Sequence, residues 1–371
     1  MIKISEPIIL REGIHALSDL EELRRTQRVW QENDVYPLQL GELFEITHPQ
    51  LLNSSTFEEL RNEFVREKLA GQEKKIQGNW IYFPWSGVLA HGVNEKEYLT
   101  LITNRNRDII TQEEQKTLQD FCVGIIGLSV GSNVATALAY GGIARDMKLA
   151  EFDTLETTNL NRIRARIDQV GMPKVRVVAQ QLYEVNPYMN PVFFTDGLTK
   201  ENLTQFVLED PKPRLIFEIM DSFEMKIHLR TLARLHGIPV IMVTNLGDRL
   251  LMDVERYDLD PGIEFFNGRA GKVPYDILNK PDIAPADKHR YAVLLAGGAK
   301  HIPQRALDSV AAIGKQLVGR PQLGSTVTIS GGVGGYLARK IALKENLRSG
   351  SWLVDLDTIF GAGSEFKISA K

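Results

Sequence analysis

The sequence predicts an α/β protein whose central part is a Rossmann-like, doubly wound and mostly parallel sheet, with a small α+β domain before it and a C-terminal extension after it. Apolar segments of strand length alternate with helical patterns from residue 123 to residue 243, as in parallel sheets covered by helices on both faces. The first strand leads into a glycine turn and a small-residue helix, from Val123 to Gly142, an arrangement that holds phosphate groups. The centre of the chain is therefore expected to bind a nucleotide.

The N-terminal domain is expected to span residues 1–103. Its residues follow a helical pattern from Leu17 to about Ala70, which Pro37 and Pro49 divide into short pieces. Gly78–Trp85 follows as a strand that a proline ends. We therefore expect a small α+β domain.

The central domain is expected to span residues 104–250, and the C-terminal part residues 251–371. In the central domain the pattern predicts five strands and four helices, the strands at 123–127, 147–152, 191–194, 214–220 and 238–243, and the helices at 131–141, 173–185, 199–208 and 223–236. After Asp253 the alternation weakens, and three prolines predict a long crossover loop over 271–289. Helices near 304–317 and 332–344 are expected to close the chain, with Gly331–Gly335 as a helix-packing or helix-start feature.

Composition narrows the class of protein. The chain has 371 residues, of which 43% are hydrophobic and 25% charged, with a net charge of -3. This balance gives no general attraction to nucleic acid, and no apolar run is long enough to cross a membrane. The first 20 residues lack the apolar core of a signal peptide, so we expect a cytoplasmic protein. No histidine pair has metal-binding spacing.

The glycine turn departs from the dinucleotide fingerprint Gly-x-Gly-x-x-Gly. Gly127 and Gly131 are present, but Ser129 replaces the middle glycine and Ser132 follows. A side chain at the middle position disfavours the close approach of a pyrophosphate bridge, while its hydroxyl can bind a phosphate. Glu151 lies 24 residues after Gly127, where a carboxylate can bind ribose hydroxyls. An NAD-dependent oxidoreductase could also use that acid, and it stays an alternative.

Polar residues that suit a triphosphate follow this acid. They are Asp153, Asn159, Arg162 and Lys174, and Asn186-Pro187 comes shortly after them. Cations and amides at this position can bind phosphate oxygens and stabilise the charge that develops as pyrophosphate leaves. An oxidoreductase has no need of such a set.

With these motifs, residues 104–250 resemble the ThiF/MoeB superfamily of adenylating enzymes, which includes the activating enzymes of ubiquitin-like proteins. The run from Asp153 to Arg162, the Gly171-Met-Pro-Lys174 segment and Asn186-Pro187 stand in the family's order and spacing. The resemblance implies binding of ATP and Mg²⁺ and release of pyrophosphate. It implies nucleotide contacts by Gly127, Ser129, Gly131, Ser132, Glu151 (to the ribose), Asp153, Asn159, Arg162 and Lys174.

The same resemblance implies roles for three further charges. Lys174 would meet the α-phosphate, and Asp221, at the end of the strand 214–220, would bind magnesium. Arg107 matches an arginine that the family extends into the neighbouring subunit's site, which implies a homodimer. We expect Arg107, Arg162, Lys174 and Asp221 to be the catalytic residues.

The cysteine content narrows the reaction. Cys122 is the only cysteine, so the family's zinc-binding cysteine pairs are missing, and so is a thiol suitably placed to accept an acyl group. The chain therefore resembles most the peptide-tailoring members of the microcin C and pantocin type, in which a nitrogen or carbon nucleophile attacks the acyl-AMP directly. This implies a peptide substrate, which the N-terminal domain and the 271–289 loop are expected to help hold. Activation of a ubiquitin-like or sulfur-carrier protein is an alternative, and a silent partner subunit is another.

Overall fold

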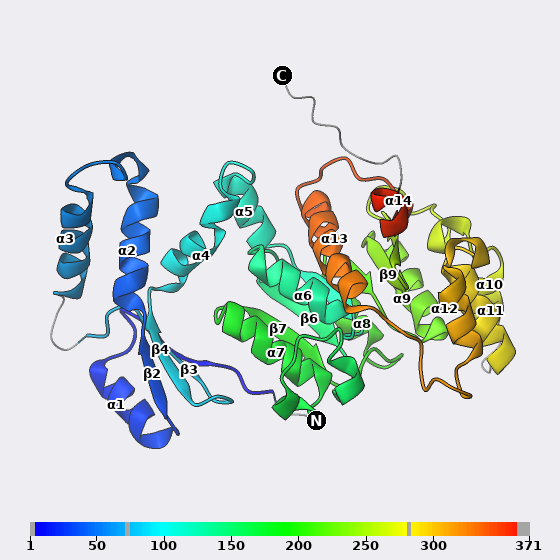
Figure 1. Cartoon of the computed structure of the whole chain (residues 1–371), viewed down its shortest axis with the longest axis horizontal. Coiled ribbons are helices and arrows are strands. Elements are labelled where there is room, and N and C mark those ends of the chain that lie inside the picture. The colour runs from blue at the N-terminus through cyan, green and yellow to red at the C-terminus, as the bar shows by residue number, and fades with distance from the viewer. Residues whose placement is uncertain (1–3, 71–74, 280–282, 362–371) are drawn as a thin grey trace. The chain divides into compact units, whose positions relative to one another are not determined.

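The computed structural model describes residues 4–70, 75–279 and 283–361. Two compact units are distinguished within the chain, and their elements are labelled in Figure 1. The first unit contains Met1–Lys116, Tyr140–Gly142 and Ala179–Met189, and the second contains Thr117–Ala139, Ile143–Val178 and Asn190–Lys371. No helix in the described part of the chain has the length and apolar character needed to cross a bilayer.

The first unit contains a four-stranded sheet among its described residues. Its order is β1 (Ile8–Leu10), β3 (Asn79–Phe83), β4 (Val88–Gly92) and β2 (Gln31–Asp34). The strands β1, β3 and β4 are antiparallel neighbours, and β2 pairs with β4 in parallel. The helices of this region are α1 (Leu17–Thr26), α2 (Tyr36–Thr47), α3 (Phe57–Leu69), α4 (Glu95–Thr103) and α5 (Gln112–Gln119). Helices α2 and α3 lie side by side (Figure 1).

Three of the four strands of the first unit, β1, β2 and β4, were not predicted. The expectation of a helical pattern from residue 17 to residue 70 holds for α1, α2 and α3, but β2 interrupts it. All four residues of β2, Gln31–Asp34, are exposed and polar, because the strand lies at the edge of the sheet. Such a strand shows no alternation of apolar and polar residues, so the sequence pattern does not reveal it.

The second unit contains a seven-stranded sheet within the described residues, and it confirms the predicted α/β class. Its order is β11 (Gly350–Asp355), β10 (Arg249–Glu255), β9 (Val240–Leu246), β8 (Leu215–Glu218), β5 (Val123–Ile126), β6 (Asp146–Ala150) and β7 (Asn190–Phe194). The five strands from β9 to β7 are parallel, and β10 and β11 are antiparallel additions. The chain order reverses between β5 and β8, where ligands bind in open sheets of this kind.

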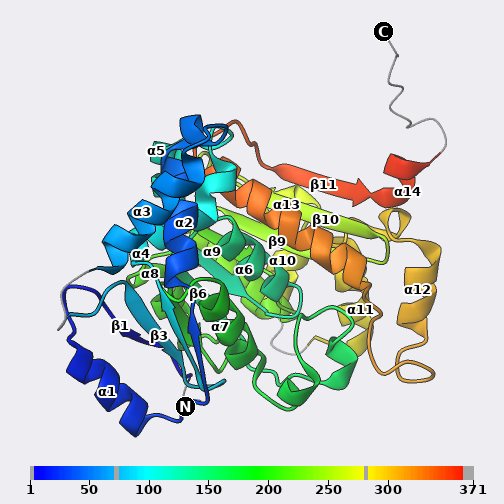
Figure 2. The ribbon, with the colours of Figure 1, turned by 60° about the vertical axis from the view of Figure 1, so that its left-hand side comes forward.

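Helices cover both faces of this sheet. On one face α6 (Gly131–Tyr140) and α13 (Gly324–Ala342) lie side by side (Figure 2). They approach closely because a Cβ atom added at Gly331 would lie 2.5 Å from the Asn133 carbonyl oxygen, which confirms that this glycine cluster serves helix packing. On the opposite face are α8 (Leu203–Leu208) and α9 (Phe223–Leu235), and Phe206 of α8 packs on Gly124 of β5.

The prediction of a long loop over residues 271–289 was wrong. The segment contains α10 (Val273–Asn279) and the first turn of α11 (Pro285–Leu295). Pro274 and Pro285 stand in the first turns of these helices, where a proline costs no backbone hydrogen bond and its fixed φ favours the helix. The two prolines therefore begin helices here. Pro281 lies outside the described residues.

The remaining elements after residue 250 also differ from the prediction. The helix expected at 304–317 is the shorter α12 (Gln304–Ala311), the helix expected at 332–344 begins earlier as α13, and α14 (Leu356–Phe360) follows β11. The strands β10 and β11 were not predicted. Strand β10 pairs antiparallel with β9 on one side and with β11 on the other. Met252 of β10 lies opposite Val243 of β9 and Trp352 of β11.

Candidate functional site

The glycine turn begins directly after β5. Gly127 has φ +87°, and a Cβ atom there would lie 2.4 Å from the Ile219 carbonyl oxygen, which follows β8. Only glycine fits both constraints. Helix α6 starts at Gly131, so its first N–H groups lie at the turn. The Ser132 hydroxyl donates to the Ser129 carbonyl at 2.9 Å and closes the turn.

Glu151 holds this turn against the loop that follows β6. Its side chain is buried, and its carboxylate accepts three backbone hydrogen bonds, from Leu128 at 2.8 Å, Phe152 at 2.9 Å and Asp153 at 3.0 Å. The carboxylate thus orients the backbone on both sides of the expected ribose position. Its contact with a ribose stays a prediction.

Lys174 and Asp153 form an ion pair next to Glu151. The Lys174 Nζ lies 2.8 Å from Asp153 Oδ2, with the lysine side chain 8% exposed and the aspartate 49% exposed. Lys174 is the first residue of α7 (Lys174–Val185). Its position is set by backbone bonds between the two loops, such as Leu155 to Met172 at 2.7 Å. The aliphatic stem of Lys174 is therefore buried, and its partner Asp153 faces solvent.

Arg162 reaches the glycine turn from a third segment. Its Nε donates to the Ser129 hydroxyl at 3.1 Å, and its Nη1 donates to the Thr158 carbonyl at 3.2 Å. Burial lowers the pKa of Arg162, a shift that Glu156 opposes. The Asn159 Oδ1 accepts from the Glu156 N–H at 3.1 Å, so this amide shapes the turn that carries the arginine.

Asp221 lies at the carboxyl end of β8. It is exposed, and it lines a cavity of about 120 Å³ together with Ser129. The second unit thus brings together all but one of the predicted site residues, namely Gly127, Ser129, Gly131, Ser132, Glu151, Asp153, Asn159, Arg162, Lys174 and Asp221. Arg107 belongs to the first unit, where it is exposed just after a short 3₁₀ turn.

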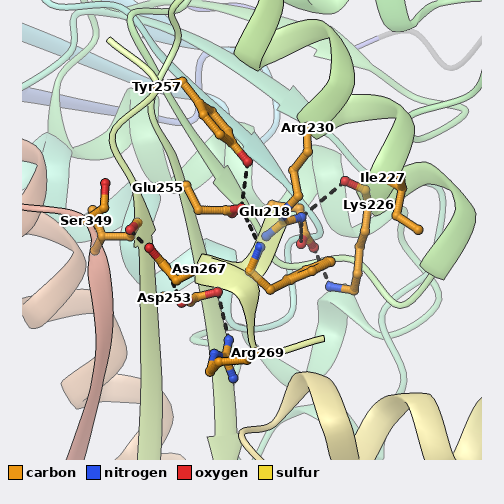
Figure 3. Close-up of polar contacts among 12 residues, drawn as sticks. Glu218, Lys226, Ile227, Arg230, Asp253, Glu255, Tyr257, Asn267, Arg269 and Ser349 are labelled. Carbon is orange, nitrogen blue, oxygen red and sulfur yellow. Dashed lines mark hydrogen bonds and ion pairs between the residues drawn. The ribbon is translucent and has the colours of Figure 1, made fainter. Parts of the chain in front are cut away.

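A buried charge network behind Asp221 was not predicted. Lys226 of α9, which also lines the cavity, is paired with Glu218 of β8. Glu218 also binds Arg230 at 2.8 Å, and Arg230 binds Glu255 of β10 at 2.8 Å. The Tyr257 hydroxyl donates to Glu255 at 2.6 Å (Figure 3). One signal was available: Lys226 and Arg230 are four residues apart and stand among apolar residues of a predicted helix.

Burial and the attraction between opposite charges shift the pKa values of this network in opposite directions. Burial alone would raise the pKa of Glu218, but the charges of Lys226 and Arg230 hold it below its ordinary value. Burial lowers the pKa of Lys226, which Glu218 opposes. Burial also raises the pKa of Glu255 to about 6, against the attraction of Arg230. The cavity is therefore bordered by a lysine whose charge depends on one buried carboxylate.

Cys122 has the surroundings of an inert thiol. It precedes β5, is 6% exposed, and its Sγ lies 3.4 Å from the Pro211 carbonyl oxygen. Burial, with the charge of Asp146, raises the pKa of Cys122 to about 12, so the reactive thiolate is scarce at neutral pH.

We expect the native protein to resist alkylation of Cys122 by iodoacetamide at mildly alkaline pH, and to react once it is unfolded in urea. Mass spectrometry of both samples measures this. Cys122→Ala is expected to lose about 1–2 kcal/mol of stability at most, as a small truncation in a packed interior does, and to keep its turnover. Rapid alkylation of the native chain with loss of product formation would show a nucleophilic thiol.

The central part of the chain is similar to a known protein family. Residues 103–248 match the model of the ThiF family, which confirms the resemblance to this family of adenylating enzymes. An uncharacterized protein of Mycobacterium tuberculosis is 33% identical over 277 residues, which are 75% of this chain and 38% of that protein. A tRNA threonylcarbamoyladenosine dehydratase of Bacillus subtilis is 30% identical over 158 residues, 42% of this chain and 60% of that enzyme. The chain thus spans less than two thirds of either relative.

Among solved structures, Escherichia coli MccB with MccA-N7isoASN superposes on 86% of this chain and 87% of that protein. The sequence identity is 14% and the TM-score 0.48.

Proposed function

We propose that this chain, whose residues 103–248 form a ThiF-family region, is an ATP-dependent enzyme that adenylates a peptide carboxylate. A carboxylate oxygen attacks the α-phosphorus of ATP, the bond from that phosphorus to the bridging oxygen breaks, and pyrophosphate leaves. The acyl-AMP formed carries a good leaving group, which a free carboxylate lacks. The observation that carries the proposal is that the second unit gathers Arg162, Lys174 and Asp221 near one glycine turn.

Each charge has a role in this reaction. Arg162, bound to the Ser129 hydroxyl, holds phosphate oxygens beside the turn. Lys174 neutralises the α-phosphate as charge builds there, and Asp153 orients its ammonium group. Such preorganised charges stabilise the transition state more than they would in water. Glu151 and Asn159 hold the loops, and Glu151 faces the ribose.

Magnesium fits the residues present. The described residues contain no group of three or more His, Cys, Asp or Glu that could enclose a metal ion, and Mg²⁺ is commonly bound by one or two carboxylates together with substrate phosphates. Asp221 supplies one exposed carboxylate at the site. When bound there, the ion would neutralise phosphate charge.

The second half of the reaction proceeds without a thiol. Cys122 is the only cysteine of the chain and is buried. A nitrogen or carbon nucleophile of the substrate therefore attacks the acyl carbon directly, and AMP leaves. This supports tailoring of a ribosomally made peptide over a thioester relay. The exposed edge strand β2 of the first unit could pair with an extended peptide, and we assign the N-terminal domain this role.

The assay that tests the proposal is pyrophosphate release from ATP and Mg²⁺ in the presence of peptide acids, with hydroxylamine to trap the acyl-AMP. We expect release that depends on both ATP and a peptide, and no binding of NAD. Binding of NAD without pyrophosphate release from any peptide would overturn the proposal in favour of an oxidoreductase.

We further propose a homodimer in which Arg107 completes the partner's site. Mixing an Arg107→Ala chain with an Asp221→Ala chain is then expected to restore about a quarter of the wild-type rate, since half the dimers are mixed and each has one intact site. The two parents alone serve as controls. If labelled subunits exchange but the mixture never exceeds its parents, Arg107 does not act in trans.

A further inference from the structure

The loop before α13 carries an arginine that the predicted site did not include. Arg320 lies between α12 and α13, outside the residues 103–248 that match the family model. It is exposed, and it lines the cavity of about 120 Å³ that Ser129 and Asp221 also line. The C-terminal part of the second unit thus brings a further positive charge close to the glycine turn.

Two contacts fix this loop against the segment that carries Arg162. The Asn161 Nδ2 donates to the Gln322 carbonyl at 2.8 Å, and a Cβ atom added at Gly324 would lie 2.3 Å from the Asn161 carbonyl oxygen. The Asn161 Oδ1 also accepts from Arg162 Nη1 at 2.9 Å. The position of Arg320 is therefore coupled to that of Arg162 through one asparagine.

Arg162 and Arg320 are two positive charges without an ion-pair partner among the described residues. The hydrogen bonds of Arg162 go to uncharged oxygens, including the Ser129 hydroxyl and the Thr158 carbonyl. Burial lowers the pKa of Arg162, and the nearby charge of Arg320 lowers it further. Two like charges at this separation repel each other. An anion that binds both guanidinium groups removes that cost and gains charge-assisted hydrogen bonds.

The rest of the polar lining carries both signs. Asp221 adds a carboxylate, and Lys226 is already paired with Glu218. The Asn245 Nδ2 and the Gln322 Oε1 are buried with no partner among the described residues. An unpaired donor beside an unpaired acceptor suits a neutral polar group better than an anion. The anion site is therefore at the border of the cavity, where the two arginines lie, and not in its interior.

The charges of the site follow the order of groups along ATP. Glu151 and Lys174, which are assigned to the ribose and the α-phosphate, do not line this cavity, whereas Arg320 and Asp221 do. The α-phosphate is the one bonded to the ribose, so the β- and γ-phosphates lie farther along the molecule. Metal ions in nucleotide sites bridge these two phosphates, and Asp221 is the carboxylate proposed to bind Mg²⁺. Arg320 therefore lies where the two distal phosphates are expected.

We propose that Arg320 binds the β- and γ-phosphates of ATP and stays bound to the pyrophosphate that leaves, which makes it a further catalytic residue. The inference rests on the proposed adenylation. In that step the bond from the α-phosphorus to the bridging oxygen breaks, and both electrons of the bond remain on this oxygen. The negative charge of the pyrophosphate increases, and the guanidinium groups of Arg320 and Arg162 stabilise it.

The test compares the binding of AMP with that of α,β-methylene ATP, because AMP lacks the two phosphates that Arg320 is proposed to bind. In Arg320→Gln, calorimetry with Mg²⁺ is expected to give a Kd for the ATP analogue that is about 10-fold higher or more, since charge-assisted hydrogen bonds are lost. The Kd for AMP is expected to stay that of the wild type. With ATP and a peptide acid, the rate of pyrophosphate release should fall about 100-fold. Arg320→Lys keeps the charge but not the bidentate geometry, so its effects should be intermediate.

The control is Arg305→Gln. Arg305 is exposed in the first turn of α12 and does not line the cavity, so this variant loses the same charge at another place. It is expected to bind both nucleotides and to release pyrophosphate as the wild type does. Thermal melting of all three variants verifies that they fold.

The outcomes separate the two proposals. An equal loss of affinity for AMP and for the ATP analogue in Arg320→Gln, or no loss for either, would overturn the role of Arg320. Unchanged nucleotide affinities with a higher KM for the peptide acid would also overturn it, because Arg320 would then bind the substrate carboxylate. A loss for the ATP analogue alone, without pyrophosphate release from any peptide acid in the wild type, would support the role of Arg320 and overturn adenylation.

Discussion

Lys174→Ala is expected to lower the rate of peptide-dependent pyrophosphate release about 100-fold or more, the usual effect of removing one charge-stabilising group. The lysine stem is buried and its ammonium is oriented by Asp153 at 2.8 Å, so truncation to alanine removes the positive charge from this place. Asp221→Ala is expected to have an effect of similar size, with a higher Mg²⁺ requirement. Single-turnover assays at saturating ATP measure both.

A matched control is Lys200→Ala. Lys200 is paired with Glu224 on the surface of the same unit, with 57% of its side chain exposed, and its loss should leave the rate near that of the wild type. A wild-type rate in Lys174→Ala and Asp221→Ala would remove both residues from the mechanism. A loss in Lys200→Ala as large as theirs would point to a general effect of charge.

Replacing Arg230 with methionine is expected to lower the free energy of unfolding by about 3–5 kcal/mol, because removing one member of a buried ion pair leaves a charge without its partner. Arg230 is fully buried and lies 2.8 Å from both Glu218 and Glu255. Urea denaturation measures the change. The control is Arg166→Met, whose pair with Asp168 is exposed at 63% and 62%. Its loss is expected to change the free energy of unfolding much less, because solvent screens an exposed pair.

A second substitution tests the cause of that loss. In Arg230→Met with Glu255→Gln the unpaired charge is removed, and part of the lost stability should return, as coupled neighbours depart from additivity. If Arg230→Met lowered the free energy of unfolding no more than Arg166→Met does, the charges of the buried network would have to be in contact with solvent. Strict additivity in the double variant would mean that Glu255 does not depend on Arg230.

Local patterns in the sequence determined the centre of the fold. The alternation of strands and helices from residue 123 to residue 243 predicted β5 to β9 within a few residues of their observed bounds. Buried parallel strands are short apolar runs, and they can be recognised without knowledge of their neighbours. The glycine turn could also be predicted from the sequence, because Gly127 adopts a positive φ angle that favours glycine.

The order of charged residues likewise predicted most of the candidate site. Glu151 stands at the end of a predicted strand, Arg162 lies in the loop that follows it, and Lys174 lies in the first turn of a predicted helix. The carboxyl ends of parallel strands meet at one edge of the sheet. Their approach in the second unit follows from that topology, which the sequence predicts. Their contacts with a nucleotide stay predictions.

The strands that pair with distant parts of the chain could be identified only in the tertiary structure. The strand β2 is polar and exposed, and β11 pairs with β10 across about 95 residues of chain. The buried charge network also depends on distant partners. Glu218, Arg230 and Glu255 come from three elements, and each charge is tolerated because the others are buried with it. A charge at an apolar position can be read from sequence, but its compensation is a property of the folded chain.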